Sequence, residues 1–218
     1  MSKRLILLLL IFTSLAFSQS DEKKAEQFFE QKKYSEAKAI YLEIYSRQPS
    51  NANVVEHLGD LSAIGKKWQT ASHYYNKLVA LNPNDPEAHY KFGGAMAMDA
   101  AQTNKLRALT MISNIEASFE KAIRLDPKHI NARWALIEFY LQLPGIFGGS
   151  ESKAAQYANE LAKLSPVDHY LAKARIDEYF ERYEKAEKNY VKAHEIGQSE
   201  TTKRKLASIR IKLKNASS

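Results

Sequence analysis

Apolar residues recur at every third or fourth position along most of this chain, a spacing that places them on one face of a helix. In residues 52–64, one such stripe consists of Val54, Leu58, Leu61 and Ile64. Proline-containing segments such as residues 82–86 interrupt the pattern, because proline lacks an N–H group and fixes its own φ angle. The pattern therefore predicts an all-α chain of amphipathic helices joined by tight turns.

The N-terminal segment follows a different pattern. Lys3 and Arg4 precede an apolar run over residues 5–17, and Ala16-Phe17-Ser18 forms a small-x-small site before Gln19. These are the three parts of a secretory signal peptide, and the run is shorter than the roughly 20 residues that span a bilayer as a helix. We predict that residues 1–18 are a cleaved signal peptide. The alternative is an uncleaved membrane anchor.

One pattern, aromatic-x-x-Ala-x-x-x-Tyr, occurs three times. The copies are Tyr34/Ala37/Tyr41, Trp68/Ala71/Tyr75 and Tyr183/Ala186/Tyr190. The first two copies are separated by the same interval as Pro49 and Pro83, about 34 residues, and Pro127 and Pro166 follow at somewhat longer intervals. Such a period is typical of a chain built from stacked supersecondary units, none of which buries its apolar stripe alone.

The residues at this spacing resemble the tetratricopeptide repeat (TPR), a unit of two antiparallel helices called helix A and helix B. The resemblance covers residues 21–199, with units near 18–51, 52–85, 86–129, 130–166 and 167–199. It implies a bacterial protein with a right-handed superhelical solenoid of about five hairpins. Within a hairpin, we expect Gly59 and Ala71 to lie where helix A and helix B approach closely.

Two of the predicted units are enlarged. About ten extra residues near 99–113 should lengthen both helices of the third hairpin by over one turn. That hairpin would then protrude as a docking ridge or fold back over the neighbouring Gly-rich loop. The Pro144–Ser150 segment, Pro-Gly-Ile-Phe-Gly-Gly-Ser, has two interpretations. Its backbone N–H groups bind an anion, or Ser150 or Ser152 caps the next helix while Ile146 and Phe147 enter the core.

Residues 200–218 predict a final amphipathic helix. Leu206, Ile209 and Leu213 share one face, and basic residues occupy most of the rest. We predict that this helix caps the last repeat, whose apolar edge would otherwise be solvated. The alternative is a helix that lies on an anionic membrane surface.

Composition narrows the possible functions. The net charge of +7 is concentrated in the leader and near the C-terminus, so we expect no nucleic-acid partner. The chain has no cysteine, and no two of its six histidines are three or four residues apart. Gly-x-Ser-x-Gly and phosphate-loop motifs are absent from the sequence. We therefore expect no enzymatic activity, no cofactor and no metal site.

In proteins that this chain resembles, helix A lines the concave surface and contacts the bound peptide. Applied to the predicted units, the resemblance implies a groove formed by Glu22, Glu26, Asn53, Glu56, Asp60, Tyr90, Met98, Asn131, Trp134 and Glu138. The family's carboxylate clamp, which binds a chaperone's C-terminal carboxylate through Lys, Asn and Arg, would have its charge reversed here.

Four of these groove residues are acidic: Glu22, Glu26, Glu56 and Asp60. Like charges held together repel, so a stable fold keeps them where the cost is small or where a partner neutralises them. We expect a partner segment with Lys or Arg, followed by an apolar anchor at Tyr90 and Trp134. The alternative is that the acids are merely solvated and the groove binds nothing.

These observations predict an exported, non-catalytic scaffold or adaptor that binds another protein or peptide, in the periplasm or at the cell envelope. The alternative function is a structural assembly or maintenance factor of the envelope. Such a protein would dock through the third hairpin, or be anchored by an uncleaved N-terminal segment.

Overall fold

The computed structural model describes residues 20–216. Within that range the chain is helical and contains no strand, which confirms the predicted fold class. The chain divides into two compact units, Met1–Gln102 (unit 1) and Thr103–Ser218 (unit 2), and each is described by itself. The predicted signal peptide, residues 1–18, lies outside the described residues.

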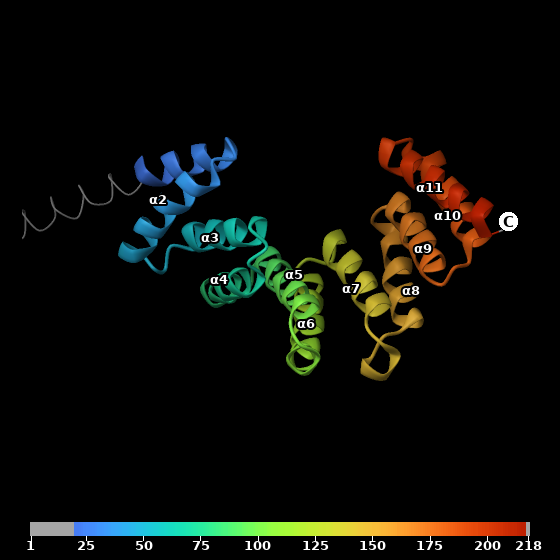
Figure 1. Cartoon of the computed structure of the whole chain (residues 1–218), viewed down its shortest axis with the longest axis horizontal. Helices are drawn as coiled ribbons and strands as arrows, with labels where there is room; N and C mark the ends of the chain where they lie inside the picture. The colour runs from blue at the N-terminus through green and yellow to red at the C-terminus, as the bar shows by residue number, and fades with distance from the viewer. Residues whose placement is uncertain (1–19, 217–218) are drawn as a thin grey trace, which may run out of the picture. The chain divides into compact units, whose positions relative to one another are not determined.

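Unit 1 starts with a helix over residues 20–30. Its other helices, labelled in Figure 1, are α2 (Tyr34–Arg47), α3 (Ala52–Ile64), α4 (Trp68–Leu81) and α5 (Pro86–Gln102). Helix α2 packs on α3, α3 packs on α4, and α4 packs on α5. The first helix, α3 and α5 correspond to helix A of the predicted repeats, and α2 and α4 correspond to helix B.

Unit 2 contains six α-helices and two short 3₁₀ turns among its described residues. They are α6 (Lys105–Leu125), α7 (Ile130–Gln142), η1 (Gly145–Phe147), α8 (Glu151–Glu160), η2 (Leu161–Lys163), α9 (Pro166–Tyr179), α10 (Tyr183–Gly197) and α11 (Glu200–Ala216). Here α7 and α9 are A helices, while α6, α8 and α10 are B helices. No helix in the described part of the chain is long and apolar enough to cross a membrane.

Short polar side chains start several of these helices. Asn51 accepts a hydrogen bond from the N–H of Val54, and Ser165 accepts one from the N–H of Asp168. Such caps satisfy backbone donors that have no partner within the helix. Pro166 occupies the first turn of α9, where its missing N–H costs nothing.

The turns from helix A to helix B reverse the chain within a few residues. Lys32, Lys66 and Glu181 have φ angles of 59°, 55° and 57°, in the left-handed region that L residues other than glycine, asparagine and aspartate seldom adopt. The N–H of Lys67 then donates to the carbonyl of Ser62. This bond satisfies a carbonyl at the end of α3.

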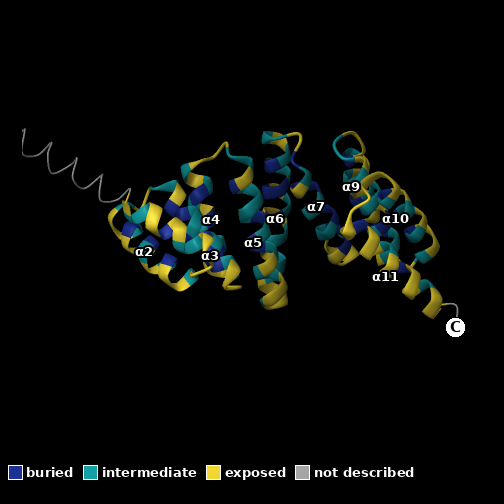
Figure 2. Ribbon diagram, turned by 90° about the horizontal axis from the view of Figure 1, so that it is seen from above, coloured by how far each residue is buried: buried dark blue, intermediate teal, exposed yellow. Residues whose placement is uncertain are grey.

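The buried residues lie where helices face each other, and the exposed residues face outward (Figure 2). Gly59 is one such contact in unit 1. A Cβ atom at position 59 would lie 2.5 Å from Cε1 of Tyr75, and Ala71, on the same helix as Tyr75, is fully buried. The close approach predicted at Gly59 is therefore confirmed, and the ring it accommodates belongs to Tyr75.

The insertion lengthens the two helices on either side of it, as predicted. Helix α5 has 17 residues and α6 has 21, whereas α3 has 13 and α4 has 14. Because α5 belongs to unit 1 and α6 to unit 2, the third hairpin as a docking ridge stays a prediction.

Of the two interpretations of the Pro144–Ser150 segment, the structure supports only the helix cap of the second. Ile146 is 87% exposed and Phe147 is 41% exposed, so the prediction that they enter the core is wrong. Ser150 does cap α8, by accepting a hydrogen bond from the N–H of Lys153. The N–H groups of residues 147–150 donate to carbonyls of Tyr140, Pro144 and Gly145, which leaves this run of amides unsuited to an anion.

Helix α11 covers the last hairpin of unit 2. Ile209 is fully buried against Ala174, Ala186 and Tyr190, and Leu206 packs beside it. Because an apolar side chain from α11 completes this cluster, the predicted capping helix is confirmed.

Candidate functional site

The predicted groove residues all lie on A helices, but they belong to both units. Seven of them lie in unit 1: Glu22, Glu26, Asn53, Glu56, Asp60, Tyr90 and Met98. Asn131, Trp134 and Glu138 lie on α7 in unit 2. We call the surface formed by the first helix, α3 and α5 the A-helix face of unit 1, and we describe the two groups separately.

Lys91 on α5 neutralises two of the four predicted acids. Its Nζ atom lies 2.7 Å from Oε1 of Glu56, and 2.8 and 3.1 Å from the two carboxylate oxygens of Asp60. Burial would lower the pKa of Lys91, but the hydrogen bonds to Asp60 and Glu56 raise it above its ordinary value. The expectation that all four acids await a partner is therefore corrected for Glu56 and Asp60.

The other two acids have a different environment. Glu22 is half-buried and accepts hydrogen bonds from the side-chain amides of Asn51 and Asn53. Glu26 is exposed, one turn further along the same helix. Among the described residues, neither Glu22 nor Glu26 forms an ion pair, so two negative charges remain on this part of the A-helix face.

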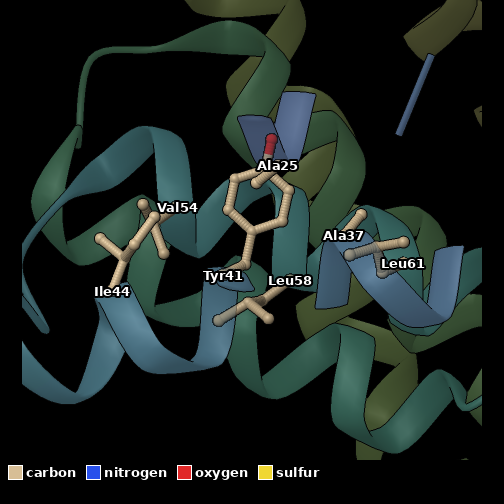
Figure 3. Close-up of a cluster of buried hydrophobic side chains, with 7 residues drawn as sticks. All are labelled: Ala25, Ala37, Tyr41, Ile44, Val54, Leu58 and Leu61. Carbon is tan, nitrogen blue, oxygen red and sulfur yellow. The ribbon is translucent and has the colours of Figure 1, made fainter. Parts of the chain in front are cut away.

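Tyr41 of α2 packs beneath these acids. Its side chain is fully buried with Ala25, Ala37 and Leu58, and its hydroxyl points toward Ala25 on the first helix (Figure 3). That hydroxyl is buried without a hydrogen-bond partner within residues 20–216. Burial raises the pKa of Tyr41, and the negative charges of Glu26, Glu22 and Asp60 raise it further.

The apolar part of the predicted site is only partly available in unit 1. Met98 is 43% exposed on α5, and Tyr90 is half-buried on the same helix. Burial raises the pKa of Tyr90, and the carboxylate of Glu87 adds to this effect. Met98 is therefore the more accessible apolar contact of the two.

In unit 2, two of the three predicted residues are hydrogen-bonded to side chains of the next A helix, α9. Glu138 accepts two hydrogen bonds from Arg175, at 2.7 and 2.9 Å, a bidentate geometry that is strong for this pair. The indole N–H of Trp134 donates to Asp168 at 2.7 Å. Asn131 is exposed at the start of α7. The predicted aromatic anchor is therefore already hydrogen-bonded to its neighbour helix.

The same arrangement continues to the end of unit 2. Lys212 of the cap lies 2.8 Å from Glu178 of α9, and the hydroxyl of Tyr190 donates to the other oxygen of Glu178 at 2.6 Å. Burial would raise the pKa of Glu178, but these two hydrogen bonds lower it below its ordinary value.

Three partners of the acids were missed from the sequence: Lys91, Arg175 and Lys212. A signal for them does exist, because each lies 31–37 residues after the acid it binds, about one repeat further along. Pairing opposite charges at that interval on successive A helices would have found them.

Within the described part of the chain, no group of three or more His, Cys, Asp or Glu side chains is placed to hold a metal ion. A hollow lies elsewhere in unit 2, on the side of α8, with a volume of about 880 Å³. Its lining includes Gln156, Asn159 and Arg133, and Arg133 is held by Glu160 at 3.0 Å. A hollow this open encloses a cofactor poorly.

No protein-family model matches this chain, and no curated protein sequence matches it. Solved structures do match. TTC0263, a thermophilic TPR protein of Thermus thermophilus, has a TM-score of 0.68 and 16% identity, over 89% of this chain and 99% of that one. A MamA protein has a TM-score of 0.64 and 18% identity, over 82% and 90%. YrrB, described as a TPR protein with an unusual peptide-binding site, has a TM-score of 0.60 and 16% identity, over 87% and 90%.

These likenesses concern the fold, because the identities are low. They agree with the recurrence of Tyr34, Ala37 and Tyr41 as Trp68, Ala71 and Tyr75 and with the helix hairpins of both units. The chain therefore has the fold of the tetratricopeptide repeat proteins.

Proposed function

We propose that this chain is a non-catalytic scaffold that binds a polypeptide segment of another protein along the A-helix face of unit 1. The observation that carries the proposal is the contrast among the predicted groove acids. Glu56, Asp60 and Glu138 have cationic partners in the chain, whereas Glu22 and Glu26 have none among the described residues. Uncompensated like charges at one surface favour a partner that neutralises them.

Other features of the same face support this proposal. Asn53 and Glu26 are exposed there, and Met98 offers an apolar contact. The fold adds weight, since one protein of similar structure, YrrB, is described as having a peptide-binding site. A segment with a basic residue and a nearby apolar residue would match both the charge and the apolar contact of this face.

A selection of random peptides displayed on phage tests the proposal. Peptides selected on the purified protein should lose at least about tenfold in affinity for Asn53→Arg, which places a cation beside Glu22. Gln69→Arg adds the same charge on α4, away from this face, and should bind as wild type. If no peptide is selected, or if selected peptides bind both variants equally, the A-helix face of unit 1 is not the functional surface.

The proposed location of this scaffold is outside the cytoplasm, in the periplasm or at the cell envelope. Support comes from the basic start at Lys3 and Arg4, the short apolar run and the Ala16-Phe17-Ser18 site. The intact mass of protein recovered from the producing cells should correspond to a chain that begins at or near Gln19. A full-length chain recovered only in detergent would instead support an anchored envelope protein.

A further inference from the structure

Two sets of four residues in unit 1 correspond, because each member of the second set lies one repeat after its counterpart in the first. Each set contains two acids from one A helix, a tyrosine from the following B helix and a basic residue from the next A helix. The first set is Glu22, Glu26, Tyr41 and His57, and the second set is Glu56, Asp60, Tyr75 and Lys91. The two sets can therefore be compared position by position, and the second set shows the contacts that form when the basic residue is a lysine.

The second set is complete. Lys91 lies within 2.8 Å of both Glu56 and Asp60, and the hydroxyl of Tyr75 donates to Oδ1 of Asp60 at 2.6 Å. The same oxygen therefore receives the ammonium group and the phenol. The ammonium group also lies 5.8 Å from the centre of the Tyr75 ring, within reach of a cation–π attraction.

The first set has the same kinds of acid and phenol but a different arrangement. Tyr75 donates to Asp60, and the equivalent acid for Tyr41 is Glu26. Yet the buried hydroxyl of Tyr41 has no partner within residues 20–216. Ala25 stands where the second set has Gly59, and a Cβ atom at position 59 would lie 2.5 Å from the Tyr75 ring. Ala25 carries the methyl group for which position 59 has no room beside the Tyr75 ring.

His57, which corresponds to Lys91, does not neutralise the acids of the first set. Its Nδ1–H donates to the carbonyl of Asn53 at 2.9 Å. Its ring stacks on Tyr41, with centroids 4.7 Å apart and planes at 23°, and Phe29 packs edge-on at 5.2 Å. The imidazole therefore serves the aromatic packing, and no described cation takes the place that Lys91 occupies in the second set.

We propose that Glu22 and Glu26 bind the ammonium group of a lysine side chain from the partner segment. This inference rests on the proposed function of unit 1 and assigns the residue that its partner must supply. This lysine of the partner would contact two carboxylates, as Lys91 does within the chain. As its charge draws Glu26 inward, the Tyr41 hydroxyl gains the acceptor that Tyr75 already has in Asp60.

Lysine fits this place better than the other cations that proteins offer. An ammonium group is a compact charge with three donors, and it is the group found between the two acids of the second set. Arg175, the arginine that links α7 and α9, behaves differently, because it directs two of its nitrogens at a single carboxylate, that of Glu138. A metal ion is a poorer match, since no metal-binding group is found among the described residues.

The first experiment uses small probes and the ring signals of Tyr41 and His57 in the NMR spectrum of the purified protein. Nα-acetyl-lysine methylamide should shift these signals in a saturable way, and the norleucine and arginine analogues should not. Glu26→Gln should weaken the response about tenfold. Equal shifts with norleucine or arginine, or an unchanged response in Glu26→Gln, would overturn the assignment to lysine.

A second experiment exchanges residues between the two sets. His57→Lys places an ammonium group where Lys91 has one, so it should abolish the response to the lysine probe. It should also shift the melting temperature, because it neutralises the two acids and removes the ring that packs on Tyr41 and Phe29. His73→Lys on α4, an exposed site away from the acids, should do neither. If His57→Lys behaves as His73→Lys does, the inference is wrong.

Selected peptides separate this inference from the proposed function. If peptides bind the A-helix face and replacing their lysines by norleucine weakens binding about tenfold, both stand. If the replacement changes nothing, the proposed function stands and the lysine site is overturned. If no peptide binds but the lysine probe responds as described, the site stands and the scaffold function fails.

Discussion

The A-helix faces of the two units differ in how their charges are used. In unit 2, Glu138 is held by Arg175 and Glu178 by Lys212, and even the indole of Trp134 donates to Asp168. In unit 1, Lys91 forms such ion pairs with Glu56 and Asp60. The acids one repeat earlier, Glu22 and Glu26, have no cationic partner among the described residues. Repeats with the same backbone thus hold their charges in opposite ways.

This difference shows how a repeat protein can separate stability from recognition. A charge pair between successive A helices fixes one repeat against the next, and it withdraws both groups from any ligand. A repeat whose acids have no cation from the next A helix lacks this stabilising contact, but its acids stay available to a partner. The choice depends on a single position per repeat, Lys91 in one case and His57 in the other.

The largest expected effect is at the end of unit 2, where α11 completes the hydrophobic core. Ile209→Ala should lower the free energy of unfolding by about 2–5 kcal/mol, because Ile209 is fully buried. Chemical denaturation followed by circular dichroism measures this loss. The matched change Ile211→Ala, at a side chain 63% exposed, should stay within about 0.5 kcal/mol. Equal effects would mean that α11 does not close the unit.

A second test asks whether the complete set of unit 1 depends on the close approach at Gly59. Gly59→Ala should cost about 1–3 kcal/mol, since the added methyl group collides with the Tyr75 ring. Gly94→Ala on α5 meets no atom within 4 Å and should stabilise the helix by about 0.5–1 kcal/mol. Thermal unfolding of the two variants gives the answer. Stabilisation by both would show that Tyr75 repacks without loss.

The third test removes one charge from each unit. Arg175→Met should destabilise the protein by about 1–2 kcal/mol, because Glu138 loses both of its hydrogen bonds. Glu26→Gln in unit 1 should leave stability unchanged or raise it slightly, since it relieves repulsion with Glu22. Urea unfolding at low and moderate salt compares the two. A loss of stability in Glu26→Gln similar to that in Arg175→Met would contradict the contrast between the units.

The smallest expected effect concerns pH. The pKa of Glu178 is lowered in the folded chain, so its contribution is present above the ordinary glutamate pKa of about 4.3 and is lost as pH falls through the folded value. Wild type should therefore lose about 0.5–1 kcal/mol more than Glu178→Gln on acidification below about pH 5. Melting curves across that range provide the measurement. Parallel curves for the two proteins would show that Lys212 does not hold Glu178.

The sequence was sufficient to predict the fold because the repeat pattern reports packing directly. Ala71 and Tyr75 recur one repeat after Ala37 and Tyr41, and each is buried between two helices. The cap was predictable for the same reason, since Ile209 shares an apolar face with Leu206. The loop at Ile146 was not, because the apolar character of a side chain in an irregular segment does not say whether a core lies within its reach.

The candidate site was predictable as a surface but not as a set of charges. The resemblance placed Glu56, Asp60 and Glu138 on A helices, which is where the structure has them. Whether an acid is open or paired depends on a side chain about one repeat later, and considering each repeat alone missed Lys91 and Arg175. That the buried hydroxyl of Tyr41 lacks a partner among the described residues depends on local packing, which the repeat pattern does not specify.

The turns between helix A and helix B have a consequence for how this chain tolerates change. Lys32, Lys66 and Glu181 hold a left-handed backbone conformation that costs an L residue about 1–2 kcal/mol each. The most regular hairpins therefore contain conformational strain that glycine would relieve. Relieving this strain at any of the three turns would raise the free energy of unfolding. Substitutions at the turns offer this chain a means of compensating costly changes to its recognition residues.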